Sequence, residues 1–227
     1  MTFWNRSLLT LAASLTLHFT CGADTGAPLQ GEWQIPNLEI AKRQIRAYVT
    51  SGRYEEEVRL VAGQARQFLE ERLRQPVQGR AAIVFDVDET CLSNYRHIAS
   101  LDFGYQPQQW NLWVAQAQAP PLRGVLELYQ YARSRGLAVV FLTGRSPDQR
   151  EKTEQNLRQA GFDEWTQLIL KPADSSESGA EFKARQRQQL SQAGLEILVN
   201  VGDQASDLAG GYSESVFKLP NPMYWLP

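Results

Sequence analysis

Cysteine, histidine and methionine are scarce in this sequence. Its 227 residues include two cysteines, Cys21 and Cys91, two histidines, His18 and His97, and two methionines. Two cysteines are too few for the disulfide framework of a small secreted domain, and so few histidines exclude a His-rich zinc site. We interpret Cys91, beside a predicted strand, as a small buried hydrophobic residue.

A large excess of one charge is also missing. Lys and Arg number 23 against 25 Asp and Glu, which gives a net charge of −2. This balance provides no electrostatic footprint for a nucleic-acid polymer or an anionic membrane. In the body of the chain, no apolar run reaches the ~18 residues of a membrane-spanning helix. The length suits one domain of ordinary size with a full core.

The N-terminal residues differ in character from the rest. An uncharged, Leu- and Ala-rich run at 7–20 follows a single arginine and is typical of a signal peptide, which we assign to residues 1–23. Cleavage after Ala23 and lipidation of Cys21, as in a bacterial lipoprotein, are both compatible with the sequence. Residues 24–36, rich in Gly and Pro, are predicted to be a flexible tether. We expect an exported protein, periplasmic or anchored to the outer membrane in a bacterium and otherwise secreted.

Residues 37–227 are predicted to form a single α/β domain that begins with a helical extension. Four short runs are apolar throughout, which is typical of parallel strands covered on both faces. They are Ala81–Phe85, Leu137–Leu142, Leu168–Leu170 and Ile197–Val201. Helical periodicity or capping signals mark Leu38–Val49, Tyr54–Leu73, Arg123–Arg135, Ser146–Gly161 and Ser178–Gly194. This alternation predicts a doubly wound, Rossmann-like parallel sheet with sites at the carboxyl ends of its strands.

Acidic residues follow the first predicted strand directly. Asp86 and Asp88 are two positions apart, so in an extended continuation both carboxylates point to the same side and share one pocket. In such a pair one carboxylate can attack a substrate while the other transfers protons. Acidic residues at strand ends are often simple turn formers, but the buried context FDVDET favours a functional site.

The other predicted strands also end in polar residues. Thr143 and the Gly144 amide form a compact donor set for a phosphoryl oxygen. Asp203, after the fourth strand, can complete a site of oxygen ligands for a hard cation such as Mg²⁺. Lys183 lies near the start of a helix, where the helix field and the ammonium group both favour an anion. Lys171, directly after the third strand, competes for the same role.

Four motifs in this order resemble the haloacid-dehalogenase (HAD) superfamily of phosphatases: FDVDET, FLTGR, Lys183 and VGDQASD. More closely, DVDETCLSN, QWNLWV, NVGDQASDLAGG and the C-terminal FKLPNPMYWLP resemble plant vegetative-storage-protein-like, class B-type acid phosphatases and bacterial lipoprotein acid phosphatases. The resemblance spans residues 38–227. One departure is the lysine context, Phe182-Lys183-Ala184, where the family pattern has Tyr or Asn before the lysine and Ser after it.

The resemblance implies a HAD-type fold and a role for each acidic residue. Asp86 would be the nucleophile that forms an aspartyl-phosphate, and Asp88 would protonate the leaving alcohol and then deprotonate water. Mg²⁺ would be held by the Asp86 carboxylate, the Val87 main-chain carbonyl and Asp203. The implied enzyme is a magnesium-dependent acid phosphatase that acts on small phosphate monoesters.

The resemblance also implies how the phosphoryl group is held. Thr143, the Gly144 amide and Lys183 would bind its oxygens, and Asp207 would support the metal's waters or orient Lys183. The insertion at residues 91–121 would form a small cap over the site. Three of its aromatic residues are candidates to stack on a nucleobase or aryl leaving group: Tyr95, Trp110 and Trp113. We expect at least two of them to form a small hydrophobic cluster instead, and 5′-nucleotides are one candidate substrate class.

Two other functions stay open from the sequence. Some plant storage relatives have lost the nucleophile, and a non-catalytic exported storage or binding protein is the first alternative, although this chain keeps Asp86. A phosphotransferase, which passes the phosphoryl group to an alcohol, is the second. A cysteine phosphatase is excluded because four residues separate Cys91 from Arg96, where that mechanism uses five. The substrate, the pH optimum and the oligomeric state are not determined by the sequence.

Overall fold

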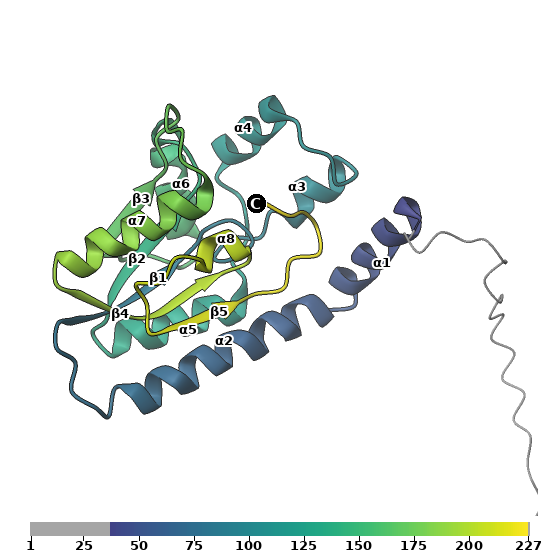
Figure 1. Ribbon diagram of the computed structural model, residues 1–227. Helices are drawn as coiled ribbons and strands as arrows, with labels where there is room; N and C mark the ends of the chain where they lie inside the picture. Colours follow the sequence, from purple (N-terminus) through teal and green to yellow (C-terminus); the bar gives the residue numbers. More distant parts are fainter. Residues whose placement is uncertain (1–36, 227) are drawn as a thin grey trace, which may run out of the picture. The chain divides into compact units, whose positions relative to one another are not determined.

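The computed structural model of the chain describes residues 37–226, so the predicted signal peptide (residues 1–23) and tether (24–36) lie outside the described residues. The described part is built on a five-stranded parallel sheet with helices on both faces (Figure 1). The strands run in the order β3-β2-β1-β4-β5. Their bounds are β1 Arg80–Phe85, β2 Ala138–Thr143, β3 Gln167–Leu170, β4 Leu195–Gly202 and β5 Ser215–Lys218. The predicted doubly wound α/β fold is confirmed.

The edge strand β5 was not predicted. Its four residues alternate between half-buried and exposed, so they do not form the uniformly apolar run that marks the other strands. It pairs with β4 in parallel register, with Val201 opposite Phe217.

The helices match the predicted helical segments and add three short ones. The predicted segments correspond to α1 (Leu38–Thr50), α2 (Arg53–Arg72), α5 (Arg123–Ser134), the turn η1 (Pro147–Gln149) with α6 (Arg150–Gln159), and α7 (Gly179–Gln192). The additions are α3 (Tyr95–Ser100), α4 (Pro107–Gln116) and α8 (Ala205–Leu208), which are too short to show a clear helical period. No helix within residues 37–226 has both the length and the apolar character needed to cross a membrane.

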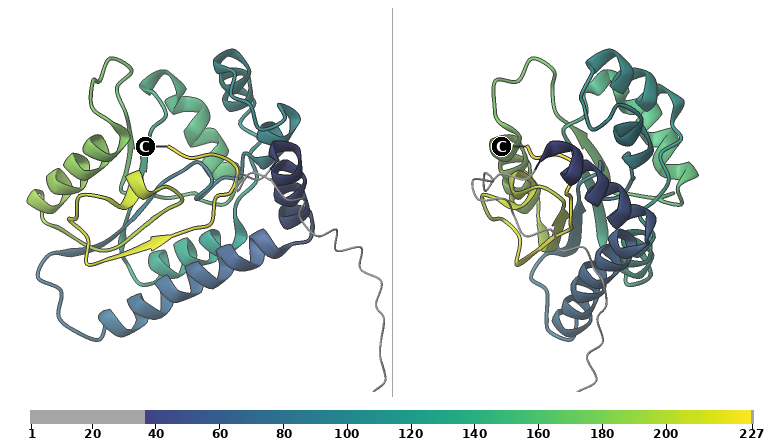
Figure 2. Two further views of the ribbon diagram at one scale, coloured as in Figure 1. Left: turned by 45° about the vertical axis from the view of Figure 1, so that its right-hand side comes forward. Right: turned by 90° about the vertical axis from the view of Figure 1, so that its right-hand side faces the viewer.

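The two faces of the sheet carry separate cores. In β1, Ile83 and Phe85 pack into the larger core, to which α2 and α5 contribute, whereas Ala82 and Val84 pack against α7 through Phe182. This alternation follows from the two-residue period of a strand. Figure 2 shows α2 and α5 together on one side of the sheet and α7 on the other. Burial on both faces explains why the strands are apolar throughout.

The insertion at residues 91–121 leaves and re-enters the fold at one point. Leu92 pairs with Pro121, and the Leu122 amide donates to the Cys91 carbonyl at 3.0 Å. Between these ends lie α3 and α4, which stand above the carboxyl end of the sheet in Figure 1. The aromatic-rich segment is therefore next to the strand ends that carry the acidic motifs.

Candidate active site

The polar residues at the strand ends meet in one cavity at the carboxyl edge of the sheet. Its volume is about 840 Å³. Asp86 and Asp88 reach it from the loop after β1, Asp203 from the loop after β4, and Lys183 from the first turns of α7. Parallel strands end at the same edge, so residues more than one hundred positions apart become neighbours.

Three buried carboxylates converge within this cavity. Oxygen atoms of Asp86, Asp203 and Asp207 all lie within 4.8 Å of one another, which is a spacing at which a single cation can be held. Lys183 Nζ is hydrogen-bonded to Asp86 Oδ1 and lies 2.6 Å from Asp207 Oδ1. From the resemblance, Asp207 was expected to support the metal's waters or to orient Lys183; its contact with Lys183 agrees with the second role, and its carboxylate also lies within the cluster.

The electrostatics of the cluster favour an additional cation. Burial raises the pKa of Asp86 well above its ordinary value, although the Lys183 charge opposes this shift. Burial, followed by the charge of Asp207, raises the pKa of Asp203 to about 7. Burial alone would lower the pKa of Lys183, but the two aspartates outweigh it and raise that pKa, so the ammonium persists. Five buried or half-buried carboxylates face two cations here: Asp86, Asp88, Glu89, Asp203 and Asp207 against Lys183 and Arg145.

The two competing lysines lie in different places. Lys183 is buried between Asp86 and Asp207. Lys171 Nζ instead donates to the Glu177 carbonyl in the loop before α7, and Lys171 does not line the cavity. Of these two lysines, Lys183 is therefore the one that can reach a group bound in the cavity.

The Val87 carbonyl, expected from the resemblance to bind the metal, is engaged elsewhere. It accepts hydrogen bonds from the Cys91 and Leu92 amides, both at 2.9 Å. A carbonyl oxygen has two lone pairs, so none is left for a cation. The expectation for Val87 is corrected on this ground. Among the described residues, the next carbonyl, that of Asp88, receives no backbone hydrogen bond in this loop.

Asp88 is held by Arg145, to which sequence reasoning assigned no role. Arg145 Nη2 lies 2.6 Å from Asp88 Oδ1, and Arg145 Nε lies 3.0 Å from Oδ2. Asn94 Nδ2 donates to Oδ1 at 2.9 Å. Oδ1 thus receives most of the donors, and Oδ2 keeps a lone pair that can carry a proton. Arg145 follows the Thr-Gly pair at the end of β2, so the strand-end pattern that selected Thr143 also pointed to it.

The two predicted phosphate-binding residues of β2 are not equivalent. Gly144 lines the cavity, and a Cβ added to it would meet no atom within 4 Å. Thr143 is fully buried and does not line the cavity. Its hydroxyl oxygen accepts a hydrogen bond of 3.1 Å from the Arg145 main-chain amide. In this arrangement Thr143 shapes the turn that presents Gly144 and Arg145.

Glu89 is a fully buried residue for which sequence reasoning found no role. Its backbone has φ of 53°, a left-handed conformation rare outside glycine. Asn94 Nδ2 donates to its Oε2 at 3.0 Å, and Tyr224 Oη donates to the same oxygen at 2.9 Å. Burial raises the pKa of Glu89 to about 7. Its position inside the DVDET motif was the available signal.

The loop after β4 is fixed by buried polar groups. Arg187, fully buried on α7, donates to the carbonyls of Asp207, Ala209 and Gly211. A side chain at Gly202 would place its Cβ 2.4 Å from the Cβ of Asp207. The loop can therefore bring Asp207 into the cluster only because position 202 has no side chain.

Two of the three cap aromatics, Tyr95 and Trp113, pack in the hydrophobic cluster, as expected for at least two of them, and Trp110 lines the cavity. Trp113 is buried, stacks on His97 at 5.5 Å between ring centroids, and donates to Asn94 Oδ1 at 2.7 Å. Tyr95 does not line the cavity, whereas Trp110 does. The most exposed aromatic rings on the cavity wall are Tyr105 and Trp225, with exposed fractions of 72% and 73%.

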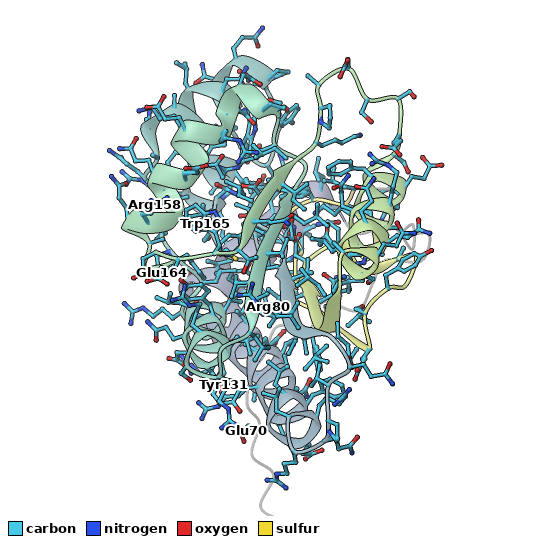
Figure 3. All side chains as sticks on the ribbon, turned by 90° about the vertical axis from the view of Figure 1, so that its left-hand side faces the viewer. Glu70, Arg80, Tyr131, Arg158, Glu164 and Trp165 are labelled. Atoms are coloured by element: carbon cyan, nitrogen blue, oxygen red, sulfur yellow. The ribbon has the colours of Figure 1, made fainter. Side chains whose placement is uncertain are left out.

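A second cavity, of about 600 Å³, lies at the opposite, amino end of the strands. Figure 3 shows Arg158, Glu164 and Trp165 on this flank of the protein. The Arg158 guanidinium lies 4.3 Å from the centre of the Trp165 ring, and Glu164 pairs with Arg133. Arg158 pairs with Glu154, Asp163 accepts a hydrogen bond from Tyr129, and none of the lining residues belongs to the acidic motifs. The active-site candidate is therefore the cavity at the carboxyl end.

Comparison with known proteins identifies the family of this chain. The family described as HAD superfamily, subfamily IIIB (acid phosphatase), matches residues 8–227. Acid phosphatase 1 of Solanum lycopersicum is 35% identical over 187 residues, covering 80% of this chain and 73% of that protein. Vegetative storage protein 2 of Arabidopsis thaliana is 36% identical over 148 residues, covering 63% of this chain and 56% of that protein.

A solved structure has the same fold. The class C acid phosphatase from Bacillus anthracis superposes with a TM-score of 0.68 at 24% identity, covering 83% of this chain and 85% of that one. The resemblance drawn from the motifs is thereby confirmed. The chain belongs to the HAD superfamily, subfamily IIIB, the acid phosphatases.

Proposed function

We propose that this acid phosphatase hydrolyses phosphate monoesters in two steps, with Asp86 as the nucleophile and Mg²⁺ as the cofactor. The observation that carries the proposal is the convergence of the Asp86, Asp203 and Asp207 carboxylates in the cavity that Asp88 and Lys183 also line. A binding or storage protein would have no need to bury so many carboxylates together at the cost of desolvation.

In the first step Asp86 attacks the phosphorus atom. Its Oδ1 is engaged by Lys183, and Oδ2 accepts no hydrogen bond from the described residues, so Oδ2 has lone pairs for attack. A bond forms between Asp86 and phosphorus while the bond from phosphorus to the ester oxygen breaks. Asp88 transfers a proton from Oδ2 to the departing alcohol.

In the second step water attacks the aspartyl-phosphate. Asp88, now a carboxylate, takes the proton of that water, and the bond between Asp86 and phosphorus breaks. The products are inorganic phosphate and the regenerated Asp86 carboxylate. Arg145 holds Asp88 in place through both steps because two of its nitrogens contact the carboxylate.

The phosphoryl oxygens would be bound by positive groups at one side of the cavity. Lys183 supplies a buried ammonium, and Gly144 supplies an accessible main-chain amide. Ser178 and Gly179, at the N-terminus of α7, line the same cavity, where the helix field favours an anion. We assign Thr143 an indirect role through the turn that presents Gly144.

The donor set fits a hard divalent cation. Asp86, Asp203 and Asp207 would hold Mg²⁺, with the Asp88 carbonyl in place of that of Val87 as the main-chain ligand. Bound Mg²⁺ would neutralise negative charge on the phosphoryl group during transfer.

Substrate choice would depend on the aromatic rings at the mouth of the cavity. Tyr105, Trp110 and Trp225 line the cavity, and in this proposal they would stack on a nucleobase or an aryl group. We expect Tyr105→Ala with Trp225→Ala to lower the rate on a nucleoside 5′-monophosphate more than the rate on a small alkyl phosphate. An equal loss on both substrates would contradict a role in leaving-group selection.

The experiment that tests the proposal is phosphate release from a panel of monoesters, with Mg²⁺ and with EDTA. Asp86→Asn replaces the carboxylate by a neutral carboxamide, which is a poor nucleophile. We expect it to lower turnover by at least about 10³-fold. Asp174→Asn, at an exposed aspartate outside the cavity, is the matched control and is expected to keep full turnover. Folded, Mg²⁺-loaded protein without turnover would favour the storage reading, and phosphoryl transfer to an added alcohol would favour the phosphotransferase.

Export is part of the proposal. It rests on the signal-peptide pattern of residues 1–23 and on Cys21 as a lipidation site. Mass spectrometry of the mature N-terminus distinguishes a diacylglyceryl cysteine at Cys21 from cleavage after Ala23.

A further inference from the structure

The C-terminal segment after β5 returns to the active site. In Figures 1 and 2 it runs from β5 across the carboxyl end of the sheet and ends beside α8. Leu219 and Met223 are buried and anchor it to the core. Between and after these anchors, two side chains, Asn221 and Tyr224, turn toward acidic residues of the site. The proposed mechanism gives neither of them a role.

Asn221 contacts the carboxylate of Asp203. Asn221 Nδ2 donates to Asp203 Oδ2 at 2.7 Å, and Gln204 Nε2 donates to the same oxygen at 2.6 Å. Thr90 Oγ1 lies 3.2 Å from the other oxygen, Oδ1. Two donors fill the lone pairs of Oδ2, so Oδ1 is the oxygen that keeps a lone pair for a cation.

The orientation of the Asn221 amide is set within the segment. Its Oδ1 accepts the Met223 amide at 2.8 Å, which forms a local turn. The amide oxygen is thus occupied by a hydrogen bond within the segment, and the NH₂ group faces Asp203. The turn and the buried Met223 together hold Asn221 in a donor orientation.

Tyr224 contacts the acidic loop that follows β1. Its hydroxyl donates to Glu89 Oε2, the oxygen that also accepts from Asn94 Nδ2. The same Asn94 nitrogen donates to Asp88 Oδ1. Tyr224 is therefore connected to Asp88 through two intervening side chains, although 135 positions separate Tyr224 from Glu89.

We propose that the C-terminal segment is a structural part of the active site, in which Asn221 orients Asp203 toward the cation and Tyr224 orients Asp88 through Glu89 and Asn94. Both are positioning residues, since each acts through another side chain. This inference rests on the proposed function, because Asp203 and Asp88 are assigned their roles there. Partners of metal ligands commonly change metal affinity or activity by 10- to 100-fold when removed.

The test uses two substitutions that leave the local fold intact. Asn221→Ser has a shorter side chain, whose hydroxyl oxygen can still accept a hydrogen bond from the Met223 amide but cannot reach Asp203. Tyr224→Phe removes only the hydroxyl. For Asn221→Ser we expect the Kd for Mg²⁺, measured by calorimetry, to rise about 10- to 100-fold. For Tyr224→Phe we expect kcat to fall about tenfold with KM and Mg²⁺ affinity unchanged.

Two control substitutions remove the same kinds of group, an amide and a tyrosine hydroxyl, at positions outside the site. Gln189→Ala removes an exposed amide on α7, and Tyr212→Phe removes an exposed hydroxyl after α8. Both are expected to behave as the original protein. If Asn221→Ser unfolds, Asn221→Thr, which also keeps a hydroxyl oxygen that can accept a hydrogen bond from the Met223 amide, replaces it in the same calorimetry.

The outcomes separate this inference from the proposed function. Unchanged Mg²⁺ affinity in Asn221→Ser together with unchanged kcat in Tyr224→Phe would overturn the inference, even if the melting temperatures fell. Absence of turnover in the original protein would contradict the proposed function, while calorimetry of Asn221→Ser would still decide the role of Asn221.

Discussion

Arg145 and Asp88 form a two-point contact, with Nη2 2.6 Å from Oδ1 and Nε 3.0 Å from Oδ2. The pair is inside the protein, since the arginine side chain is 2% exposed and the aspartate side chain 19%. A planar guanidinium can hold a carboxylate in one orientation, which a lysine ammonium cannot do. In the proposed mechanism, this contact would determine where Asp88 delivers its proton.

Replacement of this arginine should affect poor leaving groups most. We expect Arg145→Lys to lower kcat about tenfold or more on an alkyl phosphate, because the leaving alkoxide needs a well-placed proton. The loss on p-nitrophenyl phosphate should be smaller, since that leaving group departs without protonation. Arg158→Lys, at the opposite end of the sheet, is the control. Equal losses on both substrates would contradict the orientation of Asp88 by Arg145.

Removal of the buried ammonium should destabilise the metal-free protein. Lys183→Met leaves Asp86 and Asp207 without their cation, and breaking a buried ion pair in this way costs about 3–5 kcal/mol. We expect a lower melting temperature in EDTA and partial recovery when Mg²⁺ is added. Lys171→Met should change little, because Lys171 lies outside the cavity. Similar effects of the two substitutions would count against the assignment to Lys183.

The pH dependence of stability follows from three buried carboxyl groups, Asp86, Glu89 and Asp203, and burial raises the pKa of Asp86 well above its ordinary value. Burial raises the pKa of Glu89 and of Asp203 in the folded, metal-free protein, each to about 7. In the unfolded chain these groups titrate near pH 4. The folded state therefore binds more protons between about pH 4 and 7, and the free energy of unfolding falls as pH rises through that window.

This expectation is checked by thermal unfolding in EDTA from pH 5 to 8. The melting temperature should decrease over this range, and the stabilisation by Mg²⁺ should be largest at pH 8. His97, whose pKa is lowered by burial, contributes with the opposite sign, so His97→Asn should steepen the decrease. Glu89→Gln should make it shallower. A melting temperature that is constant or rises with pH would contradict the assignment.

A methyl group at position 202 should disrupt the site. In Gly202→Ala the new Cβ would lie 2.4 Å from Asp207 Cβ and 2.6 Å from its Oδ2, so Asp207 or the backbone at position 202 must shift. We expect kcat to fall at least tenfold, and stability to fall by about 1–3 kcal/mol from overpacking. Gly63→Ala is the control, since a Cβ there meets nothing within 4 Å and the residue lies within helix α2. Full activity of Gly202→Ala would show that Asp207 is not needed where the structure places it.

Local patterns in the sequence determined most of the fold. Uninterrupted apolar runs identified β1 to β4 because both faces of each strand are covered, and the capping box at Ser178 identified the start of α7. The same patterns placed Asp86, Asp88 and Asp203 at strand ends, which a parallel sheet must bring to one edge. β5 carries no such pattern because it lies at the sheet edge and is only half covered.

The partners of the site residues were decided only by the tertiary structure. The choice between Lys183 and Lys171 depends on a contact with Asp86 across 97 positions, and Tyr224 reaches Glu89 across 135. The Val87 carbonyl accepts hydrogen bonds from the Cys91 and Leu92 amides because the loop after β1 folds back on itself. Short-range patterns report the burial and capping of each element. The donors that each carboxylate receives depend on how elements pack together, and local patterns do not encode this packing.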